Sequence, residues 1–328
     1  MSKAIVVNTP GDASTMQWQD YDPGGPGRLQ VLIKHDVIGV NFLDVYHRTG
    51  LYPWPEADRL IPGAEGCGTV LTLGQDVTGL EVGDRVAYCV KTGAYSEYRV
   101  IAADRLVKLP DALDNKIVAA CMLKGLTVEY LFHRTFALGS NHTILFHAAA
   151  GGVGLLAGLW AKHLGVTIIG TTSTDEKVEI ARQNGYSHVI NYHTQDIRNE
   201  VMEITDGKGV DVVYDSVGNF TWQASLDCLK RRGLWVSFGQ SSGPVAGFDL
   251  GLLAKNGSLF ATRPSLFDYI AEPQELQASA AKLFAMLERG HLRVSIHREY
   301  ALADAATAHI ALEGRKTSGS SILIPNVA

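Results

Sequence analysis

The residues best suited to chemistry form a run of small side chains, HAAAGGVG, at positions 147–154. The run follows an apolar segment and precedes a helical pattern over 152–164, so it predicts a strand, a tight turn and a helix start. In a nucleotide-binding turn, small residues make the bend, let backbone approach a pyrophosphate, and let the helix pack on the strand. Those places are held by Ala149, Gly151 and Gly154. The alternative is a tight turn that needs small residues for packing alone.

Other motifs for chemistry are missing from the sequence. The four cysteines are scattered without a CxxC pair, which predicts neither a disulfide framework nor a structural zinc cluster. The eleven histidines form no HExxH spacing, and no GxSxG sequence is present for a nucleophilic hydrolase. His147 precedes the glycine turn, where we expect a hydrogen-bonded histidine at the end of a strand.

Composition narrows the class of protein. The chain has 328 residues, 46% of them hydrophobic and 19% charged, as in a globular protein of one large or two smaller domains. A net charge of -5 argues against a nucleic acid or an anionic membrane as the main partner. The start of the sequence lacks a secretory signal pattern, and no run of 18 apolar residues predicts a membrane span, so we expect a cytoplasmic protein.

The elements that must position the glycine turn follow two different patterns. Up to about residue 110, short β-like runs alternate with turn residues and predict a compact, mainly β domain. These runs are KAIVV, QVLIKHDVIGV, GTVLTL, DRVAYCV and YSEYRVI. Between the second and third lies a segment rich in aromatics and prolines, 41–62, which we expect to be a long functional loop.

After residue 110, helices are predicted over 114–122 and 126–138, and strands and helices then alternate. The order is TILF, helix 152–164, VTIIGT, helix 174–183, HVINY, helix 195–205, VDVVYDSVG, helix 220–230, and LWVSFG. Such alternation predicts an α/β fold with a doubly wound parallel sheet. Beyond it we expect a helix over 273–288, a strand within 291–300, a helix over 304–313, and a last strand, SSILIP, that returns to the β domain.

Seven motifs in order along nearly the whole chain carry a resemblance. They are NFLDVYHRTGLYP, LKGLTVEYL, LFHAAAGGVG, VVYDSVG, SFGQSSG, ATRPSL and GRKTSGSSILIP. Together they resemble the zinc-free, zeta-crystallin-like quinone oxidoreductases of the medium-chain dehydrogenase/reductase superfamily. The resemblance implies a GroES-like catalytic domain, 1–124 with 264–328, a Rossmann domain, 125–263, and an NADPH site in a cleft between them. It also implies a homodimer, which the apolar strands LWVSFG and SLFATR favour because an exposed sheet edge needs a partner.

Cofactor choice depends on the end of the second Rossmann strand, where NAD-binding proteins carry an acidic residue. Here Ser173 and Lys177 stand near that place and suit a 2′-phosphate, whereas we expect Asp175 to support the helix start. The resemblance adds Tyr192 and Arg315 beside the adenine ribose phosphate. The full predicted NADPH set is Asn41, Thr127, Tyr130, Ala150, Gly151, Gly152, Val153, Ser173, Lys177, Tyr192, Ser216, Gly218, Phe238, Gly239, Gln240, Ser241, Arg263, Pro264, Ser265 and Arg315.

The resemblance places Asn41, Tyr46 and Tyr52 near the nicotinamide and the quinone, where we expect them to act in catalysis by orienting the substrate. Asp44 and Glu65 match acidic positions of the zinc-dependent relatives, and we expect both to form ion pairs.

In the zinc-dependent relatives, a Cys, a His before a Glu, and a third ligand hold the catalytic metal. The matching places are Asn41, Ala64 before Glu65, and Leu123, with Cys121 close to the third. None of the three supplies the nitrogen or sulfur donor that a catalytic zinc requires, so we predict no metal.

These expectations converge on an NADPH-dependent reductase of quinones. One alternative keeps the fold and cofactor but reduces the C=C bond of an α,β-unsaturated carbonyl. Another is a cofactor-binding regulatory protein that binds RNA, which the acidic charge disfavours.

Overall fold

The computed structural model describes residues 2–54 and 58–325. The chain divides into two compact units. Unit 1 comprises residues 1–126, 269–289 and 294–328, and unit 2 comprises residues 127–268 and 290–293. Among the described residues, no helix combines the length and apolar character needed to cross a membrane.

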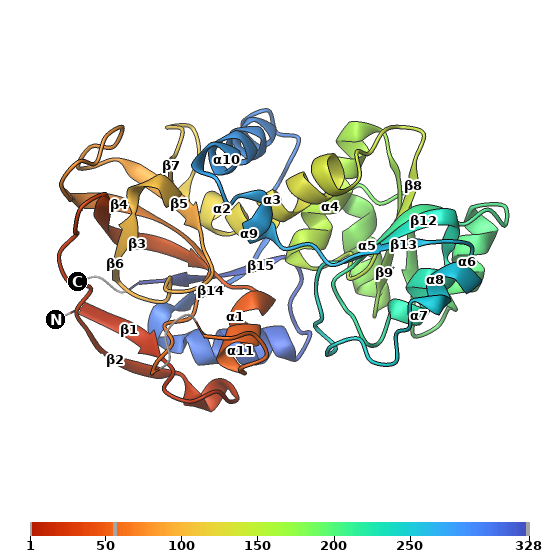
Figure 1. Ribbon diagram of the computed structural model, residues 1–328, viewed down its shortest axis with the longest axis horizontal. Helices are drawn as coiled ribbons and strands as arrows, with labels where there is room; N and C mark the ends of the chain where they lie inside the picture. The colour runs from red at the N-terminus through yellow and green to blue at the C-terminus, as the bar shows by residue number, and fades with distance from the viewer. Residues whose placement is uncertain (1, 55–57, 326–328) are drawn as a thin grey trace. The chain divides into compact units, whose positions relative to one another are not determined.

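Unit 2 is built on a six-stranded sheet in the order β10-β9-β8-β11-β12-β13, in which every neighbouring pair is parallel (Figure 1). Counted along the chain from β8, this is the 3-2-1-4-5-6 order of a dinucleotide-binding sheet. The prediction of a doubly wound parallel sheet is therefore confirmed. The strands are β8 Thr143–Phe146, β9 Thr167–Thr172, β10 His188–Asn191, β11 Val210–Asp215, β12 Leu229–Ser237 and β13 Phe260–Thr262.

The helices of unit 2 connect these strands. They are α4 Gly152–Leu164, α5 Asp175–Gln183, α6 Ile197–Ile204, α7 Trp222–Asp227, α8 Gly251–Lys255 and α9 Leu266–Tyr269, whose last residue is assigned to unit 1. Helix α4 ends at Gly165, whose φ of 71° makes a left-handed cap. The chain moves outward from β8 to β10 through α4 and α5 and returns to β11 through α6. Right-handed crossovers therefore place α6 on the face opposite α4 and α5.

Unit 1 contains a seven-stranded sheet and a two-stranded one. The larger sheet runs β14-β15-β3-β4-β5-β7, and β6 also pairs with β3. The last strand, β15, pairs with β3, which confirms that the chain returns to the β domain. The strands are β1 Ser2–Val6, β2 Gln17–Tyr21, β3 Gln30–Gly39, β4 Glu65–Leu73, β5 Arg85–Cys89, β6 Tyr98–Ala102, β7 Leu106–Lys108, β14 Ile296–Ala301 and β15 Ser320–Ile324.

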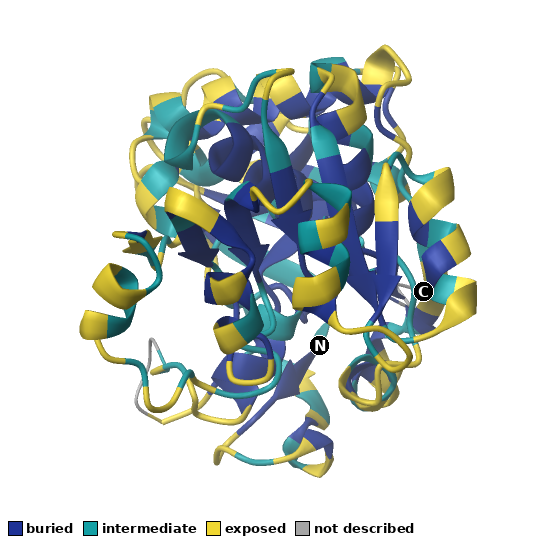
Figure 2. Cartoon of the chain, turned by 90° about the vertical axis from the view of Figure 1, so that its right-hand side faces the viewer, coloured by how far each residue is buried: buried dark blue, intermediate teal, exposed yellow. Residues whose placement is uncertain are grey.

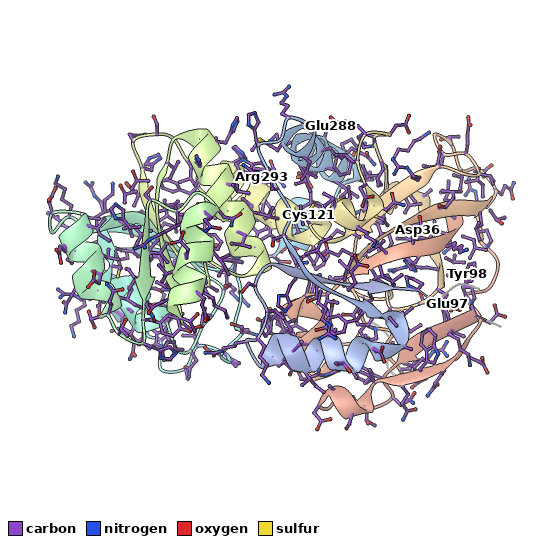
Figure 3. The ribbon with its side chains drawn as sticks, turned by 180° about the vertical axis from the view of Figure 1, so that it is seen from behind. Asp36, Glu97, Tyr98, Cys121, Glu288 and Arg293 are labelled. Atoms are coloured by element: carbon purple, nitrogen blue, oxygen red, sulfur yellow. The ribbon has the colours of Figure 1, made fainter. Side chains whose placement is uncertain are left out.

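Helices pack on this β unit. They are α1 Phe42–Arg48, α2 Asn115–Ala119, α3 Met122–Tyr130, which continues into unit 2, α10 Pro273–Glu288 and α11 Ala305–Glu313. Asp36, labelled on β3 in Figure 3, accepts hydrogen bonds from Thr69 of β4 and from Asn115 of α2, at 3.2 and 2.8 Å. This carboxylate therefore connects two strands with the first turn of a helix.

Each unit has its own apolar core. In unit 1 the core lies between the inward faces of β1, β3, β4 and β5 and the start of α11. In unit 2 one core cluster packs residues of β8 to β12 against α6 and α7. Figure 2 shows the strands buried and the outer helix faces exposed. The glycine turn follows the buried end of β8, and the aromatic segment follows the buried end of β3.

Four expectations about elements need correction. The segment 41–62 is not a continuous loop, because α1 forms directly after Asn41; residues 55–57 of the segment lie outside the described residues. Helix α3 begins at Met122, not at residue 126, and its continuation at 131–135 is a π-helix. Helix α7 ends at Asp227, because residues 229–232 extend β12. Strands β2 and β7 were not predicted; both pair with neighbouring strands although their sequences are short and partly polar.

Candidate functional site

The glycine turn of unit 2 has the geometry that its spacing predicts. After β8, Ala148 takes a left-handed φ of 57°, and the amide of Gly151 bonds the carbonyl of Ala148 at 2.9 Å. A Cβ at Gly154 would lie 2.4 Å from the Ala148 oxygen and 2.5 Å from the Ala149 oxygen. Only glycine therefore lets α4 pack this closely on the turn.

The start of α4 differs from the starts of the next two helices. Thr174 caps α5 and Asp196 caps α6, each with a side-chain oxygen that accepts a backbone N–H. The N-cap of α4 is Gly151, which has no side chain to offer. The first N–H groups of a helix have no partner inside it, and they carry the positive end of the helix dipole. The uncapped start of α4 therefore suits a phosphate of a dinucleotide, supplied by the ligand in place of a cap.

At the end of β9, the predicted 2′-phosphate residues stand around the first turn of α5. The Thr174 hydroxyl accepts from the backbone of Lys177 at 3.3 Å, and Ser173 directly precedes it. Asp175 accepts from the Asn191 side chain at 2.7 Å. This hydrogen bond turns the only acidic side chain among residues 171–175 toward the end of β10.

The loops after β11 and β12 are held against each other by backbone contacts. Asp215 accepts from the amides of Val217 and Gly218 at 2.8 and 3.0 Å. A Cβ at Gly218, whose φ is 86°, would lie 2.7 Å from the carbonyl oxygen of Gly243. A Cβ at Gly239 would lie 2.6 Å from the carbonyl oxygen of Ser216. The glycines are therefore required by close packing of the two loops at the carboxyl edge of the sheet, which is also where a dinucleotide binds in such sheets.

The other predicted nucleotide residues of unit 2 follow the same edge or the chain beyond it. Ser216, Phe238, Gln240 and Ser241 lie in the loops after β11 and β12, and Pro264 and Ser265 follow β13. Arg263 donates to the carbonyl of Ser237 at 2.7 Å. Thr127 and Tyr130 are buried residues of α3.

His147 is fully buried and has a hydrogen bond on each ring nitrogen. Nδ1 lies 2.9 Å from the Thr171 hydroxyl and Nε2 lies 3.0 Å from the Ser225 hydroxyl. Burial lowers the pKa of His147. The expectation of a satisfied histidine at the end of a strand is confirmed.

In unit 1, Asn41 belongs to a buried charged cluster. Its Nδ2 donates to Glu65 Oε1 at 2.8 Å, and Lys124 Nζ bonds the same oxygen at 2.7 Å. The amide of Leu123 donates to the other carboxylate oxygen of Glu65 at 2.5 Å. Glu65 is fully buried and Lys124 is 5% exposed. The ion pair expected for Glu65 is confirmed, and it fixes which end of the Asn41 amide faces the carboxylate.

Tyr46 and Tyr52 are brought together by α1 and the turn after it. Their ring centroids are 5.2 Å apart, and the Tyr52 amide bonds the Tyr46 carbonyl at 3.0 Å. Tyr46 is buried and Tyr52 is half-buried. Because Asn41 is the residue immediately before α1, a single short helix positions all three predicted catalytic side chains.

Contrary to expectation, Asp44 forms no ion pair with any residue that the structure describes. Its Oδ2 accepts from the backbone N–H of Asn41 at 2.8 Å and from the Tyr95 hydroxyl at 2.9 Å. Its Oδ1 is buried and has no hydrogen-bond partner among the described residues. Burial raises the pKa of Asp44 to about 7, although these two hydrogen bonds favour the carboxylate. Lys124 bonds Glu65 instead.

The hydrogen bonds continue from Tyr95 to the far side of α1. Tyr95 Oη lies 3.0 Å from His309 Nε2, and Arg48 lies 3.1 Å from His309 Nδ1. Arg48 also makes a bidentate pair with Glu313, at 2.9 and 2.8 Å. A guanidinium only donates, so Nδ1 accepts and the ring is neutral with its proton on Nε2. A neutral ring is also expected because burial and the charge of Arg48 lower the pKa of His309 to about 3.

The places that hold zinc in related dehydrogenases carry other chemistry in this chain. Ala64 is a buried methyl group, and Asn41 and Glu65 are bonded to each other beside an ammonium group. Cys121, labelled in Figure 3, is buried between α2 and α3, and burial raises the pKa of its thiol. A fixed positive charge on Lys124 disfavours a second cation, and no group of three metal-ligating side chains occurs within residues 2–54 and 58–325. These residues do not fit a catalytic zinc.

The structure thus collects the predicted residues in two places. Unit 2 holds the glycine turn, Ser173, Lys177 and the loop glycines at one sheet edge, and unit 1 holds Asn41, Tyr46 and Tyr52 around α1. Arg315 belongs to unit 1, where it is exposed after α11 with a φ of 54°. Lys124 was not predicted as a site residue, although a lysine within the apolar run CMLKGL is a sequence signal for a buried partner.

Comparisons with known proteins agree on the class. Residues 26–111 match the family described as alcohol dehydrogenase GroES-like domain, and residues 152–282 match the family described as zinc-binding dehydrogenase. A quinone oxidoreductase of Pseudomonas aeruginosa is 50% identical over 99% of this chain and 100% of its own length. A 2-haloacrylate reductase of Burkholderia is 44% identical over 99% of each chain. The crystal structure of Escherichia coli quinone oxidoreductase complexed with NADPH is 45% identical, covers 98% of this chain and 100% of its own, and superposes with a TM-score of 0.96.

Proposed function

Because the chain belongs to the quinone oxidoreductases of the medium-chain dehydrogenase/reductase superfamily, we propose that it transfers reducing equivalents from NADPH to a quinone without a metal. The observation that carries this proposal is the start of α4, where Gly151 offers no side-chain cap, together with Ser173 and Lys177 after the neighbouring strand β9. It supports a dinucleotide that brings its own phosphates, including one on the ribose.

The residues of unit 2 would hold the cofactor. The N–H groups at the start of α4 would bind the pyrophosphate, and Ser173 with Lys177 would bind the 2′-phosphate. Asp175 would not repel this phosphate strongly, because its carboxylate is turned to Asn191. Tyr192 and Arg315, with the loop residues after β11, β12 and β13, complete the proposed set.

The residues of unit 1 would hold the substrate. NADPH, when bound, supplies the reducing equivalents, and the protein contributes orientation and the exclusion of water. Asn41 has one side-chain amide hydrogen committed to Glu65. The second hydrogen on Nδ2 would donate to a quinone oxygen, together with the hydroxyls of Tyr46 and Tyr52. The Lys124–Glu65 pair would keep the Asn41 side chain in one orientation.

Turnover of two substrates tests the proposal. Purified protein should reduce a simple 1,4-quinone with NADPH at a kcat/KM well above that for a 2-alkenal, and NADH should be the poorer donor. The alternative, reduction of a C=C bond, draws support from the haloacrylate reductase among the relatives. A higher kcat/KM for the 2-alkenal than for the quinone would replace the proposal with this alternative. A salt-dependent titration with RNA tests the regulatory alternative, for which we expect no specific binding.

Three further features belong to the proposal. We infer a homodimer because β13 is an edge strand whose Phe260 is 61% exposed, and a symmetric partner would cover that edge. We infer a cytoplasmic protein, in keeping with the acidic composition. We also propose residues 1–124 with 264–328 as the catalytic domain and residues 125–263 as the cofactor domain. These bounds lie close to those of the two compact units.

A further inference from the structure

Two aromatic rings in unit 2 meet although they leave strands that are far apart in the sheet. Tyr192 follows β10 and Phe220 lies in the loop after β11, with β9 and β8 between these two strands. Three strand spacings amount to about 14 Å. The ring centroids are nevertheless only 5.6 Å apart. The two side chains and the loops that carry them therefore extend toward each other across the carboxyl ends of β9 and β8.

This position borders both proposed phosphate sites. Strand β8 leads into the glycine turn at 148–151, and β9 leads to Ser173. In the proposed complex, the pyrophosphate lies on the glycine turn and the ribose phosphate lies beside Ser173. The adenine base then still needs a binding surface. The base must then extend along the same edge, where Tyr192 and Phe220 present an aromatic surface.

Phe220 is exposed, but its backbone is held firmly. Its side chain is 61% exposed, while its amide bonds the Ser242 hydroxyl at 2.9 Å. The preceding amide, of Asn219, bonds the Gly243 carbonyl at 3.2 Å, and the Thr221 hydroxyl bonds both oxygens of Asp215 at 2.8 and 2.9 Å. A large apolar ring held toward solvent on a braced loop is preorganised to receive a flat apolar partner.

We propose that Phe220, backed by Tyr192, binds the adenine ring of the dinucleotide by contact between their flat faces. This assignment rests on the proposed function, because it takes NADPH as the ligand. A purine offers a planar π-face that stacks on aromatic side chains, and such a contact excludes water from both rings. Tyr192 is half-buried and packs against the core of unit 2, so it limits how far the phenyl ring can move.

Direct titration of three probes tests the assignment without depending on turnover. The probes are NADPH, 2′,5′-ADP, which keeps the adenine half, and reduced nicotinamide mononucleotide, which lacks it. In Phe220→Ala we expect affinity for NADPH and 2′,5′-ADP to fall about tenfold, or about 1.4 kcal/mol, and affinity for the mononucleotide to stay unchanged. Phe220→Tyr keeps an aromatic face and should restore wild-type affinity for both adenine-containing probes.

Phe260→Ala is the matched control. Phe260 is also 61% exposed, but it lies on β13, at the edge of the sheet opposite β10. At a protein concentration where the Phe260→Ala variant has the same oligomeric mass as the wild type, the variant should bind all three probes as the wild type does. Unchanged binding of 2′,5′-ADP by Phe220→Ala, or an equal loss of all three probes, would overturn the assignment alone. Failure of the wild-type protein to bind NADPH would overturn the proposed function and this assignment together.

Discussion

At the scale of single residues, Tyr52 illustrates how a site without a metal can work. Its ring lies against Tyr46, and its hydroxyl is proposed to orient a quinone oxygen. A neutral positioning hydrogen bond contributes about 0.5 to 1.5 kcal/mol, whereas an obligatory proton donor contributes roughly 10² to 10⁴ in rate. The size of the rate loss therefore distinguishes an orienting role for the Tyr52 hydroxyl from a proton-donating one.

We therefore expect Tyr52→Phe to lower quinone kcat/KM several-fold, with an unchanged pH profile, and to lower any 2-alkenal activity much more. Protonation of carbon requires a donor, whereas hydroquinone oxygens are protonated readily. Steady-state kinetics with both substrates over a range of pH measure this. A thousand-fold loss with quinone would identify Tyr52 as the proton donor and favour the alkene-reductase alternative.

Lys177 tests the choice of cofactor. If its ammonium binds the 2′-phosphate, Lys177→Ala loses a charge-assisted bond of roughly 1.5 to 3 kcal/mol and weakens NADPH about ten- to hundred-fold. NADH, which lacks the phosphate, should bind the variant almost as it binds the wild type. Fluorescence titration with both cofactors decides, and equal losses for the two would refute the assignment. Lys162→Ala, an exposed lysine on α4, is a suitable control.

Asp44 makes the stability of unit 1 depend on pH. Its folded pKa of about 7 lies above the ordinary value of 3.8, so the folded state holds the proton more tightly. The stabilisation is complete below the unfolded pKa and is lost as the pH rises through about 7. In Asp44→Asn this loss disappears, because the amide oxygen can still accept from Asn41 and Tyr95.

Relative to wild type, the unfolding free energy of Asp44→Asn should therefore rise by about 2 to 3 kcal/mol between pH 5 and pH 8. Urea unfolding at the two pH values measures the difference, and the buried histidines contribute equally to both proteins. Asp20→Asn is the control: hydrogen bonding to Lys3 lowers the pKa of this exposed carboxyl, so it titrates below pH 5 and its difference from wild type should not vary between the two pH values. A difference between Asp44→Asn and wild type that does not vary with pH would contradict this account.

At the scale of elements, the distance between α4 and its turn is set by Gly154. In Gly154→Ala the added Cβ would lie 2.4 and 2.5 Å from two carbonyl oxygens of the backbone, so the helix must move. We expect a loss of about 1 to 3 kcal/mol in stability and a marked loss of NADPH affinity, because the N–H groups move with the helix. Gly25→Ala meets nothing within 4 Å and should leave both quantities unchanged.

Thermal unfolding and NADPH titration of these two variants measure the effect. Wild-type cofactor affinity in Gly154→Ala would show that the turn is needed only for packing. The same pairing of a required and a permissive glycine would then separate the packing function of the motif from its binding function.

At the scale of the whole molecule, the exposed edge of β13 carries the proposal of a homodimer. Light scattering at micromolar concentration should give twice the chain mass of 35.4 kDa. Phe260→Lys places a charge on this edge and should shift the protein toward the mass of one chain, because charged edge residues prevent strand pairing. A monomeric wild-type protein would refute the proposal. A dimeric Phe260→Lys variant would show that the dimer interface does not lie at the β13 edge.

Much of this architecture follows from local sequence. The alternation of period-two and period-3.6 patterns after residue 110 predicted the parallel sheet, because each strand and helix must bury one face. The spacing from Ala149 to Gly154 predicted the close approach of α4, because a Cβ has no room there. The helices at 152–164 and 273–288 were predicted to the residue, since Gly165 ends the first and Pro273 begins the second.

Tertiary structure alone decided which polar groups meet. Arg48 and His309 are 261 positions apart, and Asn41 and Glu65 are 24 apart, so no periodic pattern relates them. The expected ion pair of Asp44 failed for the same reason, because Lys124 reached Glu65 and left Asp44 to Tyr95. The sequence by itself determined the helices, the strands and the glycine turn, because their conformations depend on neighbouring residues. Burial and the partners of each charge depend on which distant segments pack together, and that only the folded chain determines.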